Sequence, residues 1–193
     1  PLNETPERDM AEPQEDRDAQ PQLQMILPRE VLENPPEAEV PAGYTLRTYR
    51  PDDAEALIAL ERKAGFDNWN RELLDEMLAC ALPRGIFVVE HEGGLVATAM
   101  ATHNPTDRHP FGGELGWVAG DPAHSGRGLG RAVCAAVIRR YSQAGYERVY
   151  LKTDDHRLPA ISIYLRLGYE PYMYAPGMEE RWQAVRQNLR GGL

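Results

Sequence analysis

The chain is poor in several features that would direct it to particular protein classes. It has only two cysteines in 193 residues, Cys80 and Cys134, both in stretches that favour helix. We therefore expect small buried thiols in a reducing compartment rather than a disulfide. No cysteines and histidines show the spacing of metal ligands, so no metal site is predicted. No apolar run approaches about 18 residues, which argues against a membrane-spanning helix.

Positive charge is also scarce. Lysine and arginine number 21 against 30 acids, a net charge of −9, and this acidic balance gives no support for nucleic-acid binding, which requires a basic face. Residues 1–20 hold seven acids and two arginines, a net of −5, with few large apolar residues. This composition predicts a disordered acidic tail over residues 1–21. The same stretch has no apolar core typical of an export signal, so we expect a cytoplasmic protein.

The rest of the chain suits a single domain. A hydrophobic content of 42% is enough for one core of ordinary size. Residues 22–43 are a proline-rich segment, in which LQMIL at 23–27 is a candidate extra edge strand. Residues 44–193 are expected to form the domain itself.

Hydrophobic periodicity predicts alternating strands and helices in this domain. The expected strands are 44–49, 86–90, 95–103, 114–119, 148–153 and 170–174. The expected helices begin at 50 and at 71, follow the glycines near 130, and cover 159–167 and 178–189. This order is typical of an α/β sheet of mixed strand direction. A turn at 66–70, FDNWN, is expected to expose Phe66 and Trp69.

The most informative stretch is VAGDPAHSGRGLGR at 118–131. Three alternate glycines, at 126, 128 and 130, end a strand and open a helix. Glycines let backbone N–H groups approach a ligand closely, and a helix N-terminus favours phosphate. The stretch is neither a P-loop nor a dinucleotide fingerprint, because Gly-Lys-Ser/Thr is absent and the third glycine comes too early. It predicts a pyrophosphate-binding turn; a glycine-rich loop without a ligand is the alternative.

With these residues the chain resembles the GCN5-related N-acetyltransferase (GNAT) family, whose signature is Gln/Arg-x-x-Gly-x-Gly/Ala. Residues 125–130 match it, except that Ser125 stands in the first position. A second family segment is similar to PAISIYLRLGYEPY, with Ala160, Tyr164, Gly168 and Tyr169 in register and Arg157 where asparagine is usual. The resemblance covers about 44–174, and the mycothiol synthase-like branch is the most similar part of the family.

The resemblance implies a fold and a cosubstrate. The fold is a mixed, mainly antiparallel sheet with a splayed parallel strand pair and flanking helices, and 44–193 becomes an acyl-CoA N-acyltransferase domain. Acetyl-CoA lies in the splay, with its pantetheine on the backbone of Trp117, Val118 and Ala119. The other implied cofactor contacts are Ser125, Gly126, Arg127, Gly128, Leu129, Gly130, Arg131, Arg157, Ala160 and Tyr164.

The resemblance also implies the chemistry. An amine attacks the thioester directly, with Tyr164 as the acid that protonates the leaving thiolate. Glu114 stands where the family places a carboxylate base. Each has a structural alternative: Tyr164 as a packing residue, and Glu114 as a solvent-facing strand residue. His103 and His109 are further candidates for the base.

The resemblance further implies that the acceptor is a small-molecule amine, a peptide N-terminus or a lysine. We expect no nucleic-acid or membrane partner, and a homodimer is a candidate assembly. The acceptor side is expected to include an aromatic wall, which consists of Phe66, Trp69, Tyr172 and Tyr174. His124 and His156 adjoin the two family motifs and are candidates for polar cofactor contacts. The alternative functions are a CoA-binding sensing or scaffold module without transfer activity, and an acyltransferase that uses a different acyl-CoA.

Overall fold

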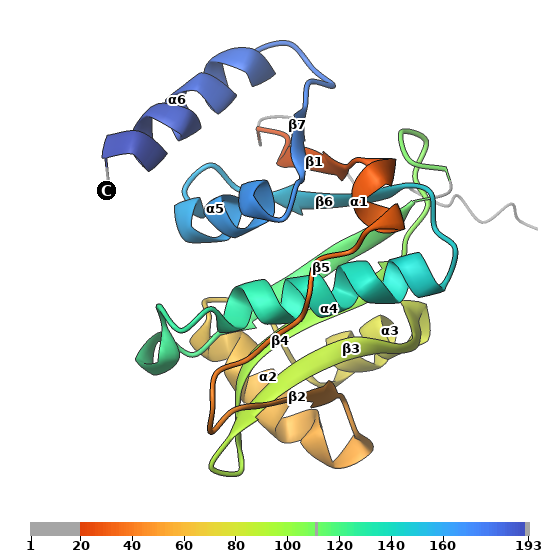
Figure 1. Ribbon diagram of the computed structural model, residues 1–193, viewed down its shortest axis with the longest axis vertical. Coiled ribbons are helices and arrows are strands. Elements are labelled where there is room, and N and C mark those ends of the chain that lie inside the picture. Colours follow the sequence, from red (N-terminus) through yellow and green to blue (C-terminus); the bar gives the residue numbers. More distant parts are fainter. Residues whose placement is uncertain (1–19, 111, 192–193) are drawn as a thin grey trace, which may run out of the picture.

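The computed structural model describes residues 20–110 and 112–191. Its centre is a seven-stranded sheet in the order β2-β3-β4-β5-β6-β1-β7 (Figure 1). The strands are β1 (Leu23–Leu27), β2 (Thr45–Thr48), β3 (Ala81–His91), β4 (Gly94–His103), β5 (Gly113–Gly120), β6 (Val149–Thr153) and β7 (Glu170–Tyr172). All neighbouring pairs are antiparallel except β5 and β6. The predicted mixed sheet with one parallel pair and flanking helices is confirmed.

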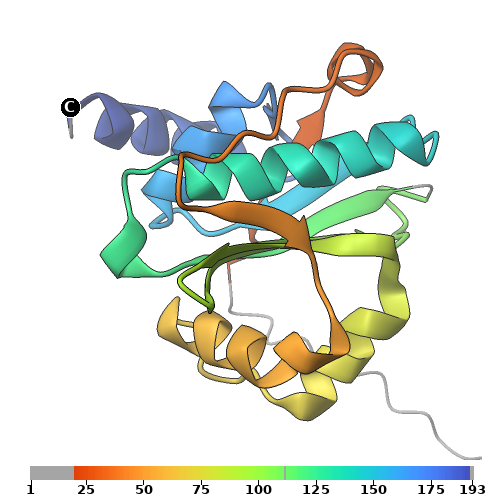
Figure 2. The same ribbon diagram turned by 60° about the horizontal axis from the view of Figure 1, so that its bottom comes forward.

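Helices cover both faces of the sheet. They are α1 (Arg29–Glu33), α2 (Ala54–Lys63), α3 (Arg71–Cys80), α4 (Leu129–Gln143), α5 (Leu158–Arg166) and α6 (Met178–Gly191). Figure 2 shows α2 and α3 on one face and α4 on the other. Each face therefore has its own apolar cluster, one around Val133 and Val137 of α4 and one around Leu57 of α2 and Leu74 of α3. Strand β4 lies between them and is almost wholly buried.

Strand β1 is the main departure from the expected topology. Residues 23–27 do form a strand, but it is not at an edge: it lies between β6 and β7 and is antiparallel to both. Leu23, Met25 and Leu27 are each at most 1% exposed. Residues 23–27, which lie outside the expected domain of residues 44–193, are thus part of the sheet.

The parallel pair β5–β6 is short because the strands separate. Only Gly113 and Glu114 of β5 pair with β6, opposite Val149 and Tyr150. Further along, β5 carries one extra residue relative to β4, and Trp117 adopts a φ of 50° at this irregularity. A bulge bends its strand. Beyond Glu114 the β6-facing side of β5 is therefore open, as the resemblance implies.

Some local expectations are wrong. Trp69 is fully buried rather than exposed, because its ring packs edge-on against Trp117. Cys134 is buried as expected, whereas Cys80 is only partly buried. The predicted acidic tail falls almost entirely on residues 1–19, which lie outside the described residues. Within the described ranges, no helix combines the length and hydropathy that crossing a membrane requires, and no acidic, histidine and cysteine side chains gather as metal ligands would.

Candidate functional site

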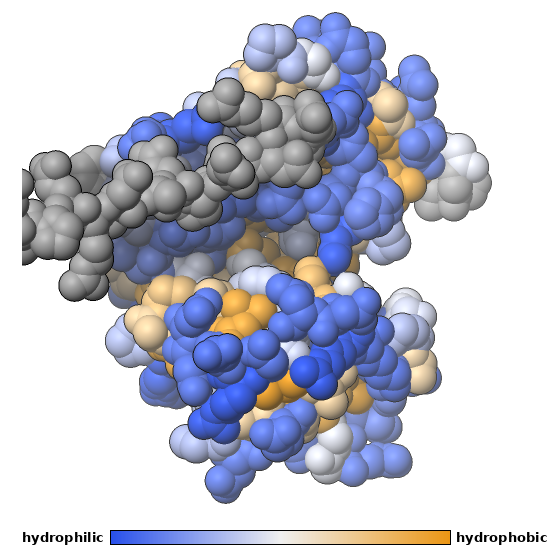
Figure 3. Space-filling view, turned by 180° about the vertical axis from the view of Figure 1, so that it is seen from behind, coloured by the Kyte–Doolittle hydropathy of each residue, from blue (hydrophilic) through white to orange (hydrophobic). Residues whose placement is uncertain are grey.

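A cavity of about 430 Å³ lies where β5 and β6 separate. Its walls come from both strands, the last turn of α3, the loop after α2 and the helix α5. Figure 3 shows the molecule hollowed on the side that carries α2 and α3, with hydrophobic residues inside. The cavity brings together six residues that the sequence singled out, which are Phe66, Glu114, Trp117, Val118, Arg157 and Tyr164.

Glu114 lies on the cavity wall and is the last residue of β5 that pairs with β6. Its Oε2 accepts hydrogen bonds from the amide of Asn104 and, at 3.2 Å, from the hydroxyl of Tyr150. The ammonium of Lys152 lies 3.4 Å from its Oε1. The Glu114 side chain is only 16% exposed, so it faces the cavity and not open solvent. A carboxylate held by three donors is fixed in one orientation.

The two histidines that were candidates for the same role lie elsewhere. His103 is exposed and makes a hydrogen bond of 2.8 Å with the hydroxyl of Tyr146. His109 is buried beneath Tyr150, with ring centroids 4.1 Å apart, and its Nε2 lies 2.9 Å from the Gln24 side-chain oxygen. Neither ring lines the cavity.

Tyr164 reaches the cavity from α5. Helical spacing puts it on the same buried face as Ile161, and it is 6% exposed. Burial raises the pKa of its hydroxyl well above the ordinary value, because the phenolate loses hydration. The hydroxyl is therefore protonated throughout the neutral range.

Part of the cavity wall is aromatic. Phe66 packs edge-on against Trp117 at 5.3 Å, and the guanidinium of Arg157 lies 4.2 Å from the Phe66 ring centre. Trp69 stands behind Trp117. Tyr172 and Tyr174 stack on each other on and after β7 and do not line the cavity. The expected aromatic wall is thus represented in the cavity by Phe66, together with Trp117.

The glycine turn leads into α4 with the geometry that an anion site needs. Gly126 and Gly128 have φ values of 73° and 76°, a left-handed conformation that side chains disfavour. Gly128 caps α4, which begins at Leu129, so the first N–H groups of the helix have no intrahelical acceptor. Exposed N–H donors and the positive end of the helix dipole together favour phosphate.

The other residues that were expected to contact the cofactor lie partly beside the glycine turn and partly outside the cavity. Arg127 lies near the Tyr44 ring, 5.9 Å from its centre, and Arg131 donates at 3.4 Å to the carbonyl of Glu37. Ser125 is exposed beside the glycines, and Gly130 lies against Ile163 of α5. Ala119 and Ala160 offer no side chain to the cavity. The two histidines beside the family motifs lie outside it as well: His124 forms a hydrogen bond of 2.9 Å with the Tyr44 hydroxyl, and His156 is exposed.

Several lining residues were not anticipated, and four of them bear on the chemistry of the cavity. They are Met77, Cys80, Asn104 and Lys152. Lys152 carried a weak signal, as the one charged residue in the apolar strand VYLKT. Met77 and Cys80 gave none, because the end of α3 reaches the cavity only through the tertiary packing. Burial raises the pKa of the Cys80 thiol, which disfavours its thiolate.

Comparisons with known proteins identify the family of this chain. The model of the acetyltransferase (GNAT) family matches residues 54–169. A mycothiol acetyltransferase of Saccharomonospora viridis is 35% identical over 150 residues, which are 70% of this chain and 48% of that protein. One of Frankia casuarinae is 32% identical over 153 residues, or 72% and 44%. The chain thus spans about half the length of these relatives.

Solved structures show the same fold. A GCN5-related N-acetyltransferase from Kribbella flavida is similar with a TM-score of 0.56 at 23% identity, over 79% of this chain and 55% of that one. A tandem GNAT protein from the clavulanic acid biosynthesis pathway gives a TM-score of 0.57 at 21% identity, over 80% and 51%. With a family model that covers most of the domain and curated relatives above 30% identity, the chain belongs to the GNAT acetyltransferase family.

Proposed function

We propose that the chain is an N-acetyltransferase that moves an acetyl group from acetyl-CoA to a primary amine by direct attack. The observation that carries this proposal is the cavity at the β5–β6 splay, with Glu114 and Tyr164 both on its wall. The family membership supports it, since the family consists of acetyltransferases.

The residues present fit acetyl-CoA as the donor. The open side of β5 at Trp117 and Val118 offers backbone groups to the pantetheine amides. The turn from Ser125 to Arg131 offers N–H groups to the pyrophosphate, and Gly126 and Gly128 keep side chains out of its way. Holding both reactants in one cavity makes the attack effectively unimolecular.

The proposed step forms a C–N bond and breaks the C–S bond of the thioester. Glu114 accepts the proton that the amine loses, directly or through water, and Tyr164 donates a proton to the departing thiolate. A covalent route through Cys80 is disfavoured, because burial raises the pKa of this thiol and so disfavours the nucleophilic thiolate. Glu114 thus gains one proton from the amine, Tyr164 gives one proton to the thiolate, and no acyl-enzyme forms.

The acceptor is a small-molecule amine, a peptide N-terminus or a lysine. The names of the curated relatives make a mycothiol-type amine the first acceptor to test. The aromatic Phe66 and the charged Arg157 and Lys152 form the part of the wall that an acceptor would meet.

A thiol-release assay tests the proposal. The protein is mixed with acetyl-CoA and a panel of amines, aminosugars and peptides, and free CoA is measured. We expect amine-dependent CoA release from the wild type. We expect none from Gly128→Val, because a branched side chain strains the left-handed backbone conformation that Gly128 adopts in the turn. Tight CoA binding without release would favour the sensing or scaffold module. Faster release from a longer acyl-CoA would favour an acyltransferase with a different donor.

A further inference from the structure

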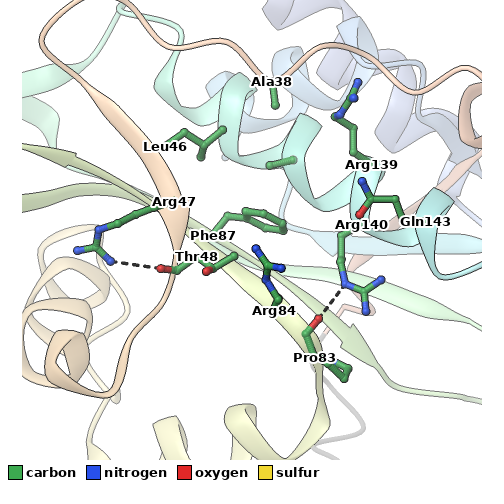
Figure 4. A pocket seen from close by; sticks show the side chains of 11 residues that line it. Ala38, Leu46, Arg47, Thr48, Pro83, Arg84, Phe87, Arg139, Arg140 and Gln143 are labelled. Atoms are coloured by element: carbon green, nitrogen blue, oxygen red, sulfur yellow. Dashed lines mark hydrogen bonds between the residues drawn. The ribbon is translucent and has the colours of Figure 1, made fainter.

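A second cavity, of about 720 Å³, lies away from the first and shares no lining residue with it. It lies between the C-terminal half of α4, strand β2 and the start of β3, under the segment that connects α1 to β2 (Figure 4). The glycine turn is at the opposite end of α4. The volume is in the range of pockets that hold small organic ligands, about 300–1,000 Å³.

The cavity is rich in guanidinium groups. Among the residues that line it are Arg84, Arg139 and Arg140, and no aspartate or glutamate is among them. Within the described ranges, Arg84 and Arg140 have no carboxylate partner, and Arg139 meets only the exposed Glu37, at 3.1 Å. In a chain of net charge −9, such a concentration of positive charge marks a place for an anion.

A fourth arginine on the wall plays a different part. The Arg47 guanidinium lies 2.7 Å from a carboxylate oxygen of Asp53 and 2.8 Å from one of Glu90. Its charge is therefore matched within the protein. It anchors β2 to β3 and is not available to a ligand.

The backbone aims Arg84 into the cavity. Arg84 has a φ of 59°, an uncommon conformation for a residue with a side chain, at the irregularity between Ala81 and Ile86 of β3. The Nε of Arg140 donates at 2.8 Å to the carbonyl of Pro83 and so ties this irregular segment to α4. Figure 4 shows the Arg84 side chain directed between Phe87 and Arg140. Bulges commonly redirect a side chain in this way.

The remaining wall is apolar. Phe87 and Leu46 project from the sheet, and Ala38 and Ala136 face them from the connecting segment and α4. Phe87 is only partly buried, so its ring is accessible from the cavity. One side of the cavity thus suits a planar or apolar body, and the other suits a charged group.

We propose that this cavity binds a small organic phosphate. Arg84 and Arg140 hold the phosphate oxygens through their paired N–H groups, with Arg139 at the rim, and the planar body of the ligand lies against Phe87. Guanidinium forks match phosphate geometry and make strong charge-assisted hydrogen bonds. The site is independent of the acetyl-transfer cavity.

Calorimetry on the full chain tests the proposal, with uridine diphosphate as the probe. We expect binding that added CoA does not displace, and no binding of uridine, which lacks the phosphates. Arg84→Ala is expected to weaken binding about tenfold or more, and Arg84→Lys less, because lysine keeps the charge but not the fork. The matched control is Arg71→Ala, which removes an exposed arginine from α3 on the opposite face of the sheet and leaves binding unchanged.

Arg139→Ala gives a second test in case the Arg84 variants do not fold, because Arg139 lies in the regular part of α4. It is expected to weaken binding severalfold. The proposal is overturned if uridine diphosphate does not bind at millimolar concentration, if CoA displaces it, if uridine binds equally well, or if the folded arginine variants bind as the wild type does.

Discussion

Glu61 gives the sharpest prediction about stability. It lies on α2, is fully buried, and neither of its carboxyl oxygens has a hydrogen-bond partner among the described residues. Burial raises the pKa of Glu61 from 4.5 to about 9, although the positive charge of Arg157 opposes the shift. Glu61 is therefore a neutral acid in the folded protein at pH 7 and an ionised one in the unfolded chain.

The sign of the pH dependence follows from this difference. Between pH 4.5 and about 9 the folded state keeps a proton that the unfolded state has lost, so stability falls as the pH rises. The slope from this one group is about 1.4 kcal/mol per pH unit. At pH 7 the loss amounts to roughly 3 kcal/mol relative to its value below pH 4.5, and near pH 9 to roughly 6 kcal/mol.

Glu61→Gln removes the titration and keeps the shape of the side chain. The difference in unfolding free energy between variant and wild type is expected to grow in favour of the variant by about 1.4 kcal/mol per unit from pH 5 upward. Other titrating groups are common to both proteins and cancel. Urea denaturation followed by circular dichroism, at intervals from pH 5 to 9, measures this difference.

Glu55→Gln is the matched control, because Glu55 lies on the same helix and is exposed. Its difference from the wild type is expected to stay nearly constant with pH. If the Glu61→Gln difference is also constant across this range, then Glu61 ionises normally in the folded protein and the reasoning from burial is refuted.

Three further predictions concern the site and the sheet. Tyr164→Phe is expected to lower kcat about a hundredfold with the affinity for acetyl-CoA unchanged, since only the transition state loses a proton donor; full turnover would leave Tyr164 a packing residue. Glu114→Gln is expected to lower kcat with an amine that is protonated at the assay pH, and an amine of lower pKa should partly restore it; equal losses with both amines would contradict the base role. Deleting residues 1–19 is expected to leave the Tm unchanged in thermal denaturation, whereas deleting residues 1–27 removes β1 and should prevent cooperative unfolding; the opposite pattern would refute the role assigned to this strand.

Local sequence patterns predicted much of the fold and part of the candidate site. The glycine turn was predictable because a left-handed backbone and a following helix depend on nearby residues such as Gly126 and Gly128. The placing of Glu114 and Tyr164 on one cavity came through family motifs, and the structure brings these two residues to its wall. Their catalytic roles stay predictions.

What the sequence did not reveal depends on packing between distant segments. The pattern of residues 23–27 predicts a strand but says nothing of its partners, so an edge position was expected where the structure has an internal one. Trp69 was expected in an exposed turn because its burial depends on Trp117, which lies on another element. Cys80 and Lys152 line the cavity through the arrangement of α3 and β6, which no local period encodes.

The position of β1 also has a consequence for how the protein folds. Leu23 pairs with Thr153, about 130 residues later, and Ile26 with Glu170. A ribosome therefore releases the apolar segment LQMIL long before its two neighbours exist. Closing so long a loop costs entropy, and contacts between distant residues form slowly. Insertion of this strand is expected to be a late event in folding, and until then the exposed segment is open to strand pairing with other chains.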